Sequence, residues 1–335
     1  MTKRALNIIV SLVVAGLFIW LAIRNVNLPE VWAQIQSVTF YWLPFFVIVM
    51  LFSHFLRAER WRLLLVNEGK EVNRSTLFAG VMLGYVVNNI VPRLGEISRP
   101  VYVAKKGNMN SSSLLGTIVT ERLFDLATMI LLIAIAAFFL ISDVNFVEQV
   151  LGFETDEWRS YLFIPATGIL LFICAWLLFR FFVYLEKNEK INHPFILKLA
   201  EFVSSFGKGM TSIRYVKNWP LFLLLTAGIW AGYVVMTYLP FFMMNLQAEF
   251  GLTLKAAVVL TMVSSIGVSI PTPAGIGSYH LLIQQSMWLL YNIPLVSALT
   301  YATVTHAVTV LLVFLTGPLA LWWDKYYTLK NSINR

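Results

Sequence analysis

Charged side chains interrupt a long apolar stretch of this sequence, and they are the first candidates for chemistry. Glu121, Arg122 and Asp125 lie within residues 113–141, which are otherwise uncharged and largely apolar. On a helix, Glu121 and Asp125 share one face, and Arg122 can pair with Asp125. A charge at the centre of a membrane helix costs about 2.5–3.5 kcal/mol on insertion scales, so such residues usually face a protein interior or a wet cavity.

A second charged group, Arg93, Glu96 and Arg99, lies nearby in the sequence. Together the two groups carry no net charge, which is typical of a mutually compensated cluster. Two interpretations stay open. The cluster is either a structural ion-pair network that fixes neighbouring helices, or a polar slot in which an arginine binds a lipid phosphate. In the second case, carboxylates of the two groups are candidates to carry protons.

Two apolar stretches are interrupted by proline and glycine, about half a chain apart. Proline removes a backbone donor and glycine permits sharp turns, so we expect both helices to break. Broken backbone at membrane depth is tolerated only where it is buried in protein or lines a wet cavity. Paired interruptions of this kind indicate the binding site of an inverted-repeat transporter. The residues are Pro92 and Gly95 in the first break, with Asn88 and Asn89 placed to bond freed backbone groups, and Pro271, Pro273, Gly275 and Gly277 in the second.

The composition indicates that these residues lie on helices embedded in a membrane. The chain is 59% hydrophobic and 13% charged, whereas soluble domains have roughly 25% charged residues. Its apolar blocks are close to the ~20 residues that a helix needs to cross the hydrocarbon core, and the alternation of barrel strands is absent. We predict an all-α, polytopic membrane protein with membrane segments at 5–23, 41–58, 76–91, 113–141, 161–183, 220–243, 255–270, 278–293 and 297–323.

Lys/Arg bias predicts the orientation. The linkers 57–74 and 180–218 are basic and 142–160 is acidic, so the first two and both termini should be cytoplasmic and the third external. Each half then contains a re-entrant hairpin followed by a full crossing, in opposite orientation, although 255–293 is long enough to cross twice. We predict one domain, 1–335, with repeat halves of approximately 1–160 and 161–335.

Several other features complete the expected arrangement. An amphipathic helix over about 194–214 should lie on the inner interface, and a shorter helix at 30–38 on the outer one. Arg57, Arg60 and Arg62 are either snorkelling interface residues or ligands. Packing or hydrogen bonding within apolar helices is the simplest role for His280 and His306. Tryptophans should form an aromatic belt at Trp20, Trp42, Trp61, Trp219, Trp322 and Trp323.

Composition and motifs also argue against other classes. The net charge of +8 is spread between membrane segments, which argues against nucleic acid as a partner. A single cysteine excludes a disulfide framework and a cysteine-based metal site. No nucleotide, metal-protease or hydrolase motif is found, so no cofactor is expected.

Four short motifs resemble those of the transmembrane, flippase-like region of the lysylphosphatidylglycerol synthase family, over nearly the whole chain. Full-length synthases of that family add a soluble aminoacyl-transferase domain, but this sequence ends shortly after its last expected membrane segment. The resemblance therefore implies lipid translocation rather than lysine transfer. Where a glutamate is expected after the Gly-x-Gly turn, this chain has Ser278-Tyr279-His280. The motifs are Arg57-Ala-Glu-Arg60-Trp61, the segment from Asn89 to Arg99, Glu121-Arg122-Leu-Phe-Asp125, and the segment from Pro271 to Gly277.

The resulting hypothesis is a flippase or scramblase-like lipid translocase of the bacterial cytoplasmic membrane. Its cargo would be a phospholipid or polyprenyl-linked lipid. The alternatives are an intramembrane lipid-modifying enzyme and a non-catalytic subunit of a lipid or glycan pathway, and homo-oligomerisation and pathway-enzyme partners stay open. The candidate substrate-binding residues are Arg57, Asn89, Arg93, Arg99 and Arg122, and the candidate proton or charge network is Glu96, Glu121, Asp125 and His280.

Overall fold

A computed structural model describes residues 3–65, 72–140 and 211–333 of the chain. Within these ranges the regular structure is helical and no strand occurs, which confirms the all-α prediction. The expected membrane segment 161–183 lies outside the described residues. So does nearly all of the amphipathic helix expected over about 194–214, of which the last residues belong to the short 3-10 helix η2 (Thr211–Tyr215).

The chain divides into two compact units. The larger contains Met1–Leu63, Lys70–Gly107 and Lys217–Arg335, and the smaller contains Leu64–Gly69 and Asn108–Val216. The described part of the smaller unit consists of α6 (Ser111–Leu140) and η2, which contact each other. The division into repeat halves at about residue 160 is a different one, and it stays a prediction.

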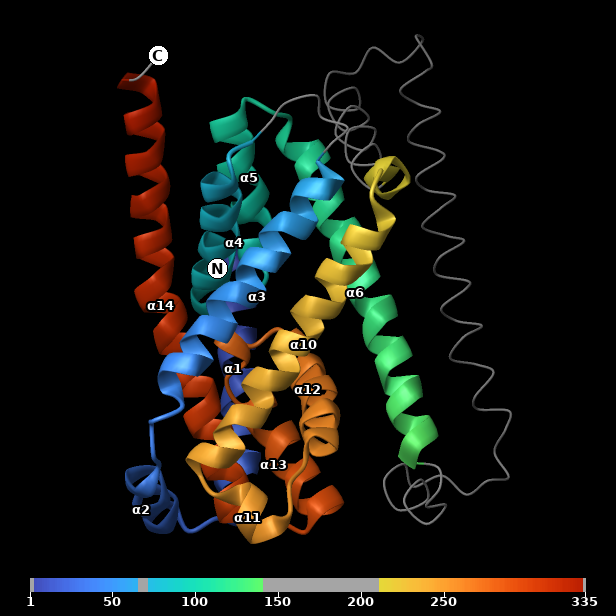
Figure 1. The fold of residues 1–335 in the computed structure, drawn as a ribbon. Helices are drawn as coiled ribbons and strands as arrows, with labels where there is room; N and C mark the ends of the chain where they lie inside the picture. Colours follow the sequence, from blue (N-terminus) through green and yellow to red (C-terminus); the bar gives the residue numbers. More distant parts are fainter. Residues whose placement is uncertain (1–2, 66–71, 141–210, 334–335) are drawn as a thin grey trace, which may run out of the picture. The chain divides into compact units, whose positions relative to one another are not determined.

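The other helices that the structure describes belong to the larger unit, and Figure 1 shows their arrangement. The expected short helix at 30–38 is present as α2. The expected segments at 5–23, 41–58, 76–91 and 220–243, and the three from residue 255 onward, all coincide with helices. The helices of this unit are α1 (Lys3–Ile23), α2 (Leu28–Ser37), α3 (Leu43–Leu64), α4 (Arg74–Ile90), α5 (Gly95–Gly107), α10 (Trp219–Met243), α11 (Leu246–Phe250), α12 (Leu254–Ser269), η3 (Pro273–Gly275), α13 (Ser278–Tyr291) and α14 (Leu295–Ile333).

Local sequence explains where several helices begin. Pro29 and Pro220 lie in the first turns of α2 and α10, where the missing N–H is not needed. Asn218 caps α10, because its side chain accepts the N–H of Leu221 at 3.0 Å. The five-residue helix α11 is flanked by Asn245 and Gly251, both in the left-handed conformation that ends helices.

Two helices of the described chain are long and apolar enough to cross a membrane, α10 and residues Leu295–Thr328 of α14. A third span is possible if α1 and α2, which meet at an 88° bend, act as one. By contrast, α4, α5, α12 and α13 have 17, 13, 16 and 14 residues. At 1.5 Å per residue they measure about 20–26 Å, less than the ~30 Å hydrocarbon core.

These four short helices form two hairpins. Gly84 of α4 lies against Gly95 and Arg99 of α5, and Gly80 lies against Val103, so the helices run antiparallel. In the second hairpin, Gly267 of α12 lies against Tyr279 of α13. Figure 1 shows the α4–α5 hairpin in one half of the larger unit and the α12–α13 hairpin in the other.

Helix α14 runs beside both hairpins. Near its start, the carbonyl of Leu295 accepts a hydrogen bond from Gln284 of α13 at 3.3 Å. Further along, a Cβ on Gly317 would collide with Val86 of α4. The helix therefore links the two hairpins along its length.

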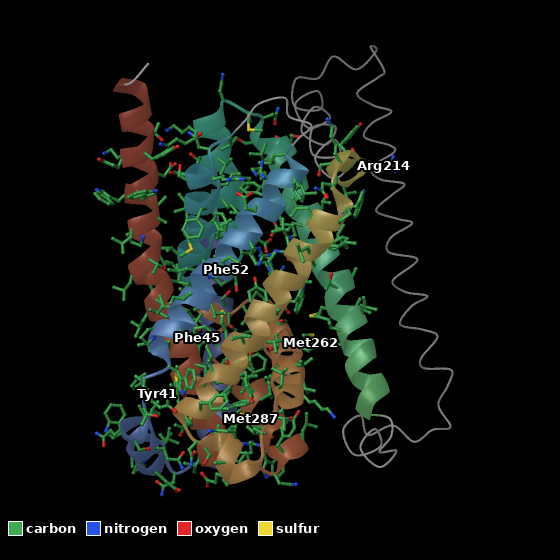
Figure 2. The ribbon with its side chains drawn as sticks, viewed as in Figure 1. Tyr41, Phe45, Phe52, Arg214, Met262 and Met287 are labelled. Carbon is green, nitrogen blue, oxygen red and sulfur yellow. The ribbon has the colours of Figure 1, made fainter. Side chains whose placement is uncertain are left out.

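The main core cluster of the larger unit is apolar and includes the first part of this helix. Phe241 of α10 packs on Tyr301 of α14 with ring centroids 5.4 Å apart, and Met287 of α13 is fully buried in the same cluster. Outward-facing aromatic residues such as Phe45 and Phe52 lie along α3 and suit contact with lipid (Figure 2).

The expected aromatic belt is present only in part. Trp20, Trp219, Trp322 and Trp323 are exposed. Trp61 is fully buried, so its assignment to the belt is wrong.

Candidate functional site

The two helix breaks meet inside the larger unit. Arg93, in the first break, donates from Nη2 to the carbonyl of Ser269 at 3.5 Å, where α12 ends before the second break. Helix α4 also contacts η3, the short helix within the second break. A helix C-terminus carries partial negative charge, so it favours the nearby guanidinium.

The first break is shaped by a glycine and an asparagine. The N–H of Gly95 donates to Asn88 Oδ1 at 2.6 Å, which satisfies a backbone group freed at the start of α5. A Cβ on Gly95 would collide with the carbonyl of Gly84, so no other residue fits this approach. Arg93 itself has φ +63°, the left-handed conformation that reverses the chain. The predicted backbone role is thus confirmed for Asn88, and among the described residues no comparable bond is found for Asn89.

The second break is held by hydroxyl groups. Ser278 is fully buried, and its Oγ donates to the carbonyl of Gly267 at 2.8 Å and lies 3.0 Å from Thr272 Oγ1. Gly275 and Gly277 have positive φ, as a turn between two helices requires. Gly277 also lies directly against the α1 backbone at Ala15, where a side chain would not fit.

Two histidines attach to the backbone of this second break. The ring nitrogen Nε2 of His306, on α14, lies 2.8 Å from the carbonyl oxygen of Ala274. The N–H of Gly277 points to Nδ1 of His280 at 3.4 Å. The two imidazole centroids are 4.8 Å apart. The sequence predicted packing or hydrogen bonding for both residues, and the structure gives each of them a backbone partner.

A buried arginine joins three helices of the same unit. Nη1 of Arg57 donates to the hydroxyl oxygens of Tyr85 at 3.0 Å and Tyr233 at 2.9 Å, from α4 and α10. His54, one turn earlier on α3, packs against Tyr85 with the rings tilted by 32° and their centroids 4.2 Å apart. His54 is 4% exposed, and neither of its ring nitrogens has a hydrogen-bond partner among the described residues.

Two further arginines are buried beside aromatic rings. Arg60 lies over Phe222 and donates to Thr226 at 3.3 Å, and the guanidinium carbon of Arg99 lies 4.1 Å from the centroid of Trp61. Such cation–π contacts stabilise a desolvated guanidinium. Arg57 and Arg60 are 5% and 0% exposed, so the snorkelling interpretation is wrong for both.

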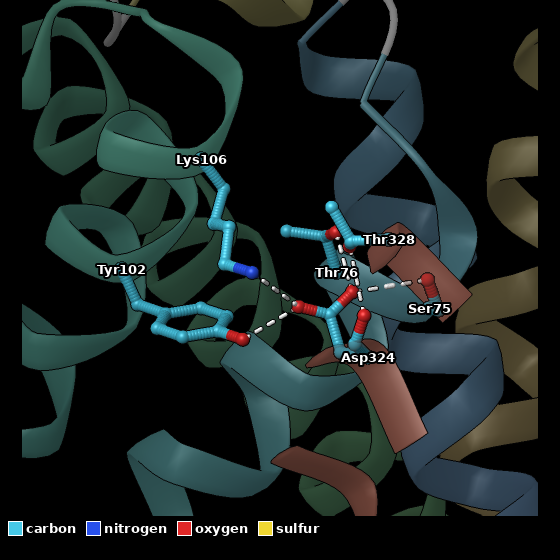
Figure 3. A network of polar contacts seen from close by, with 6 residues as sticks. All are labelled: Ser75, Thr76, Tyr102, Lys106, Asp324 and Thr328. Atoms are coloured by element: carbon cyan, nitrogen blue, oxygen red, sulfur yellow. Dashed lines mark hydrogen bonds and ion pairs between the residues drawn. The ribbon is translucent and has the colours of Figure 1, made fainter. Parts of the chain in front are cut away.

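A buried carboxylate near the end of α14 was missed by the sequence reasoning. Asp324 is fully buried and accepts hydrogen bonds from Thr76 at 2.6 Å, Ser75 at 3.0 Å and Tyr102 at 2.6 Å (Figure 3). Lys106 Nζ lies 3.5 Å from the same carboxylate. This network fastens α14 to both helices of the first hairpin.

The six predicted cluster residues are divided between the units. Glu121, Arg122 and Asp125 belong to the smaller unit, in which Glu121 is buried and Arg122 is exposed. Arg93 is exposed and contacts the second break, whereas Arg99 is buried against Trp61. These two arginines thus have different neighbours, and a single compensated cluster of all six residues stays a prediction.

No group of three or more His, Cys, Asp or Glu in the described part of the chain could hold a metal ion. The site therefore consists of two helix breaks in contact, a histidine pair, and arginines buried among aromatic rings.

The fold and this site define a multi-pass, all-α membrane protein with paired broken helices. The family model described as the lysylphosphatidylglycerol synthase TM region matches residues 8–317, and the chain belongs to this family.

Curated relatives of this chain are membrane proteins of an archaeon. The UPF0104 membrane protein MJ1078 of Methanocaldococcus jannaschii is 30% identical over 193 residues, which cover 57% of this chain and 74% of that protein. MJ1595 of the same organism, also a UPF0104 membrane protein, is 22% identical over 202 residues, 59% of this chain and 54% of its own length. No solved structure matches the chain.

Proposed function

We propose that this protein is a lipid translocase that moves the head-group of a lipid through the region of the two helix breaks while the acyl or prenyl tails stay in the membrane. The observation that carries the proposal is the contact of Arg93 with the carbonyl of Ser269, because it joins the two breaks. Broken helices that meet at membrane depth are the usual binding sites of transporters built from inverted repeats.

Buried arginines support an anionic head-group. Arg57 is held by two tyrosine hydroxyls, beside the imidazole of His54. Guanidinium, phenol and imidazole groups all donate hydrogen bonds, and phosphate oxygens accept them. A phosphodiester, as in a phospholipid or a polyprenyl-linked lipid, matches this donor set.

Family membership supports a role at the membrane and leaves the cargo open. The matched family model is that of the transmembrane region of the synthases, not of an aminoacyl-transferase domain. We therefore propose transport rather than lysine transfer, in the cytoplasmic membrane and with both termini cytoplasmic.

A leaflet-exchange assay in proteoliposomes tests this function directly. Purified protein is reconstituted with a panel of labelled phospholipids and polyprenyl-linked lipids, and exchange is followed by chemical quenching of the outer leaflet. Arg93→Ala should slow lipid exchange about tenfold, which is the effect of losing one charge-assisted hydrogen bond to the phosphate of the head-group. The matched control is Arg24→Ala, since Arg24 is an exposed arginine on the same unit.

The same assay distinguishes the alternatives. Equal exchange by both variants would exclude Arg93 from the path. Covalent conversion of the labelled lipid without exchange would replace the translocase by a lipid-modifying enzyme. Absence of exchange for every lipid, with stable co-purification of a pathway enzyme, would instead favour a non-catalytic subunit.

A further inference from the structure

The histidine pair at the second break has fixed hydrogen-bond roles. A carbonyl oxygen only accepts hydrogen bonds, so Nε2 of His306 must be protonated and donate to the carbonyl oxygen of Ala274. The N–H of Gly277 only donates, so Nδ1 of His280 must present its lone pair. Each imidazole therefore binds one backbone group of the break, and His280 can do so only while its Nδ1 carries no proton.

His280 acts as an N-terminal cap of α13. It is the third residue of the helix, and its imidazole accepts a hydrogen bond from the N–H of Gly277, the residue that precedes the helix. A glutamate or glutamine normally makes this bond in a capping box. Gly277 has no side chain to return the bond, so the imidazole alone supplies this side-chain cap.

Protonation affects the two histidines in opposite ways. A proton on Nδ1 of His280 turns the acceptor into a donor that faces the N–H of Gly277, and the cap is lost. The new positive charge also lies in the first turn of α13, where the helix dipole disfavours cations by about 0.3–1 kcal/mol. A proton on Nδ1 of His306 leaves its bond to Ala274 intact. Because the rings are 4.8 Å apart, the two positive charges would repel each other.

The surroundings of the pair contain few other ionisable groups among the described residues. Tyr279 contacts both imidazoles, and its hydroxyl is bonded to Thr305 at 2.9 Å. From α1, the contacts at Gly277 come from Ala15, Phe18 and Ile19.

The other neighbouring elements add little charge near the pair. The ionisable group of α12 is Lys255, which is exposed near the opposite end of that helix. On the side of the first hairpin, Arg93 is a charged residue that contacts Ser269, the last residue of α12. Both histidines are half-buried.

We propose that His280 is a proton-binding site and that its protonation releases the second hairpin at Gly277, while His306 keeps Ala274 attached to α14. The proton comes from water and converts the imidazole to imidazolium, and it returns to water when the bond to Gly277 forms again. The release is a property of the break alone. Its use as the driving force for lipid movement rests on the proposed function.

Two substitutions separate the roles of the pair. In His280→Asn, the amide oxygen takes the place of Nδ1, so it still accepts from Gly277 but does not titrate. In His306→Gln, the amide nitrogen takes the place of Nε2 and still donates to Ala274. Both variants keep the break closed, and only the first removes the proton-binding group.

The first measurement follows the break without any lipid assay. A nitroxide is attached at Ile276→Cys in a Cys174→Ser background, and its mobility in nanodiscs is recorded from about pH 8 to about pH 4. This window extends below the usual range of histidine, because the helix dipole and the second imidazole disfavour the charged form. Mobility should rise on acidification in the parent and in His306→Gln, and should stay constant in His280→Asn. A parent without a pH response, or His280→Asn with the parent's response, would overturn the proposal.

The second measurement imposes a pH gradient on the proteoliposomes. Lipid exchange should depend on the gradient in the parent and lose that dependence in His280→Asn. A nitroxide response without exchange of any lipid would reject the translocase and retain the proton site. Lipid exchange without a nitroxide response would retain the translocase and reject the proton site.

Discussion

At the scale of single residues, close contacts between backbones determine what the sequence tolerates. Gly95 lies against Gly84 and Asn88, while Gly277 lies against α1. Polar side chains then bond the backbone groups that the breaks leave free, as Asn88, Ser278 and His306 do. Glycine and a nearby polar partner together make an interrupted helix stable in apolar surroundings.

Gly95→Ala should destabilise the first hairpin by about 1–3 kcal/mol, the usual cost of overpacking a tight contact. The added methyl group would meet the carbonyl of Gly84, and backbone cannot move aside as a side chain can. Thermal unfolding in detergent, followed by size-exclusion chromatography, measures the change. Gly16→Ala is the control, because nothing lies within 4 Å of the added Cβ. Equal melting of the two variants would contradict the described contact.

Asp324→Ala should destabilise the protein by about 1–3 kcal/mol, the usual cost of leaving buried polar groups without a hydrogen-bond partner. It leaves Lys106 and three hydroxyl groups without their shared acceptor. Lys325→Ala changes the next, exposed residue and should leave melting unchanged. If both variants melt alike, Asp324 does not fasten α14 to the first hairpin.

Much of the fold could be predicted from the sequence, because apolar blocks and proline–glycine interruptions are local signals. The burial of Arg57 and Arg60 could not, since an arginine at the end of an apolar segment has the same local pattern whether it reaches water or an aromatic ring. Asp324 was missed for a related reason. Its partners Thr76 and Tyr102 lie more than two hundred residues away in the chain, so no local sequence pattern predicts them.

At the scale of elements, the helices of each hairpin are too short to cross the membrane, and the break within one hairpin contacts the break within the other. The order of short helix, break, short helix and long helix occurs twice, in α4–α5–α6 and in α12–α13–α14. This order is the one expected for two repeats, and the contact of Arg93 with Ser269 brings the two breaks together.

Cysteines placed at Arg93 and Ser269, in a Cys174→Ser background, should be joined by a short bifunctional thiol reagent. The reason is that the two positions contact each other across the breaks. Crosslinking should also stop lipid exchange, because it holds the two hairpins together. A pair at Arg93 and Leu289 is the control, since Leu289 is exposed near the far end of α13. Failure of the first pair to react more than the second would argue against the contact.

At the scale of the whole molecule, the charge distribution predicts how the chain is inserted. The basic linkers 57–74 and 180–218 should face the cytoplasm, and the acidic linker 142–160 should face outward. Single cysteines in a Cys174→Ser background, labelled in intact cells with a membrane-impermeant thiol reagent, test this directly. Cysteines in 142–160 should react and those near the C-terminus should not. The opposite pattern would invert the proposed topology.

Helix α14 is longer than a bilayer is thick. Its apolar part, Leu295–Thr328, has 34 residues, about 51 Å at 1.5 Å per residue, against ~30 Å of hydrocarbon. Such a mismatch is accommodated by tilting the helix or by thickening the surrounding bilayer, at a cost that grows with each ångström. Since α14 is attached to both hairpins, a change in its tilt would act on both breaks together, and acyl-chain length would become a variable that sets how readily they separate.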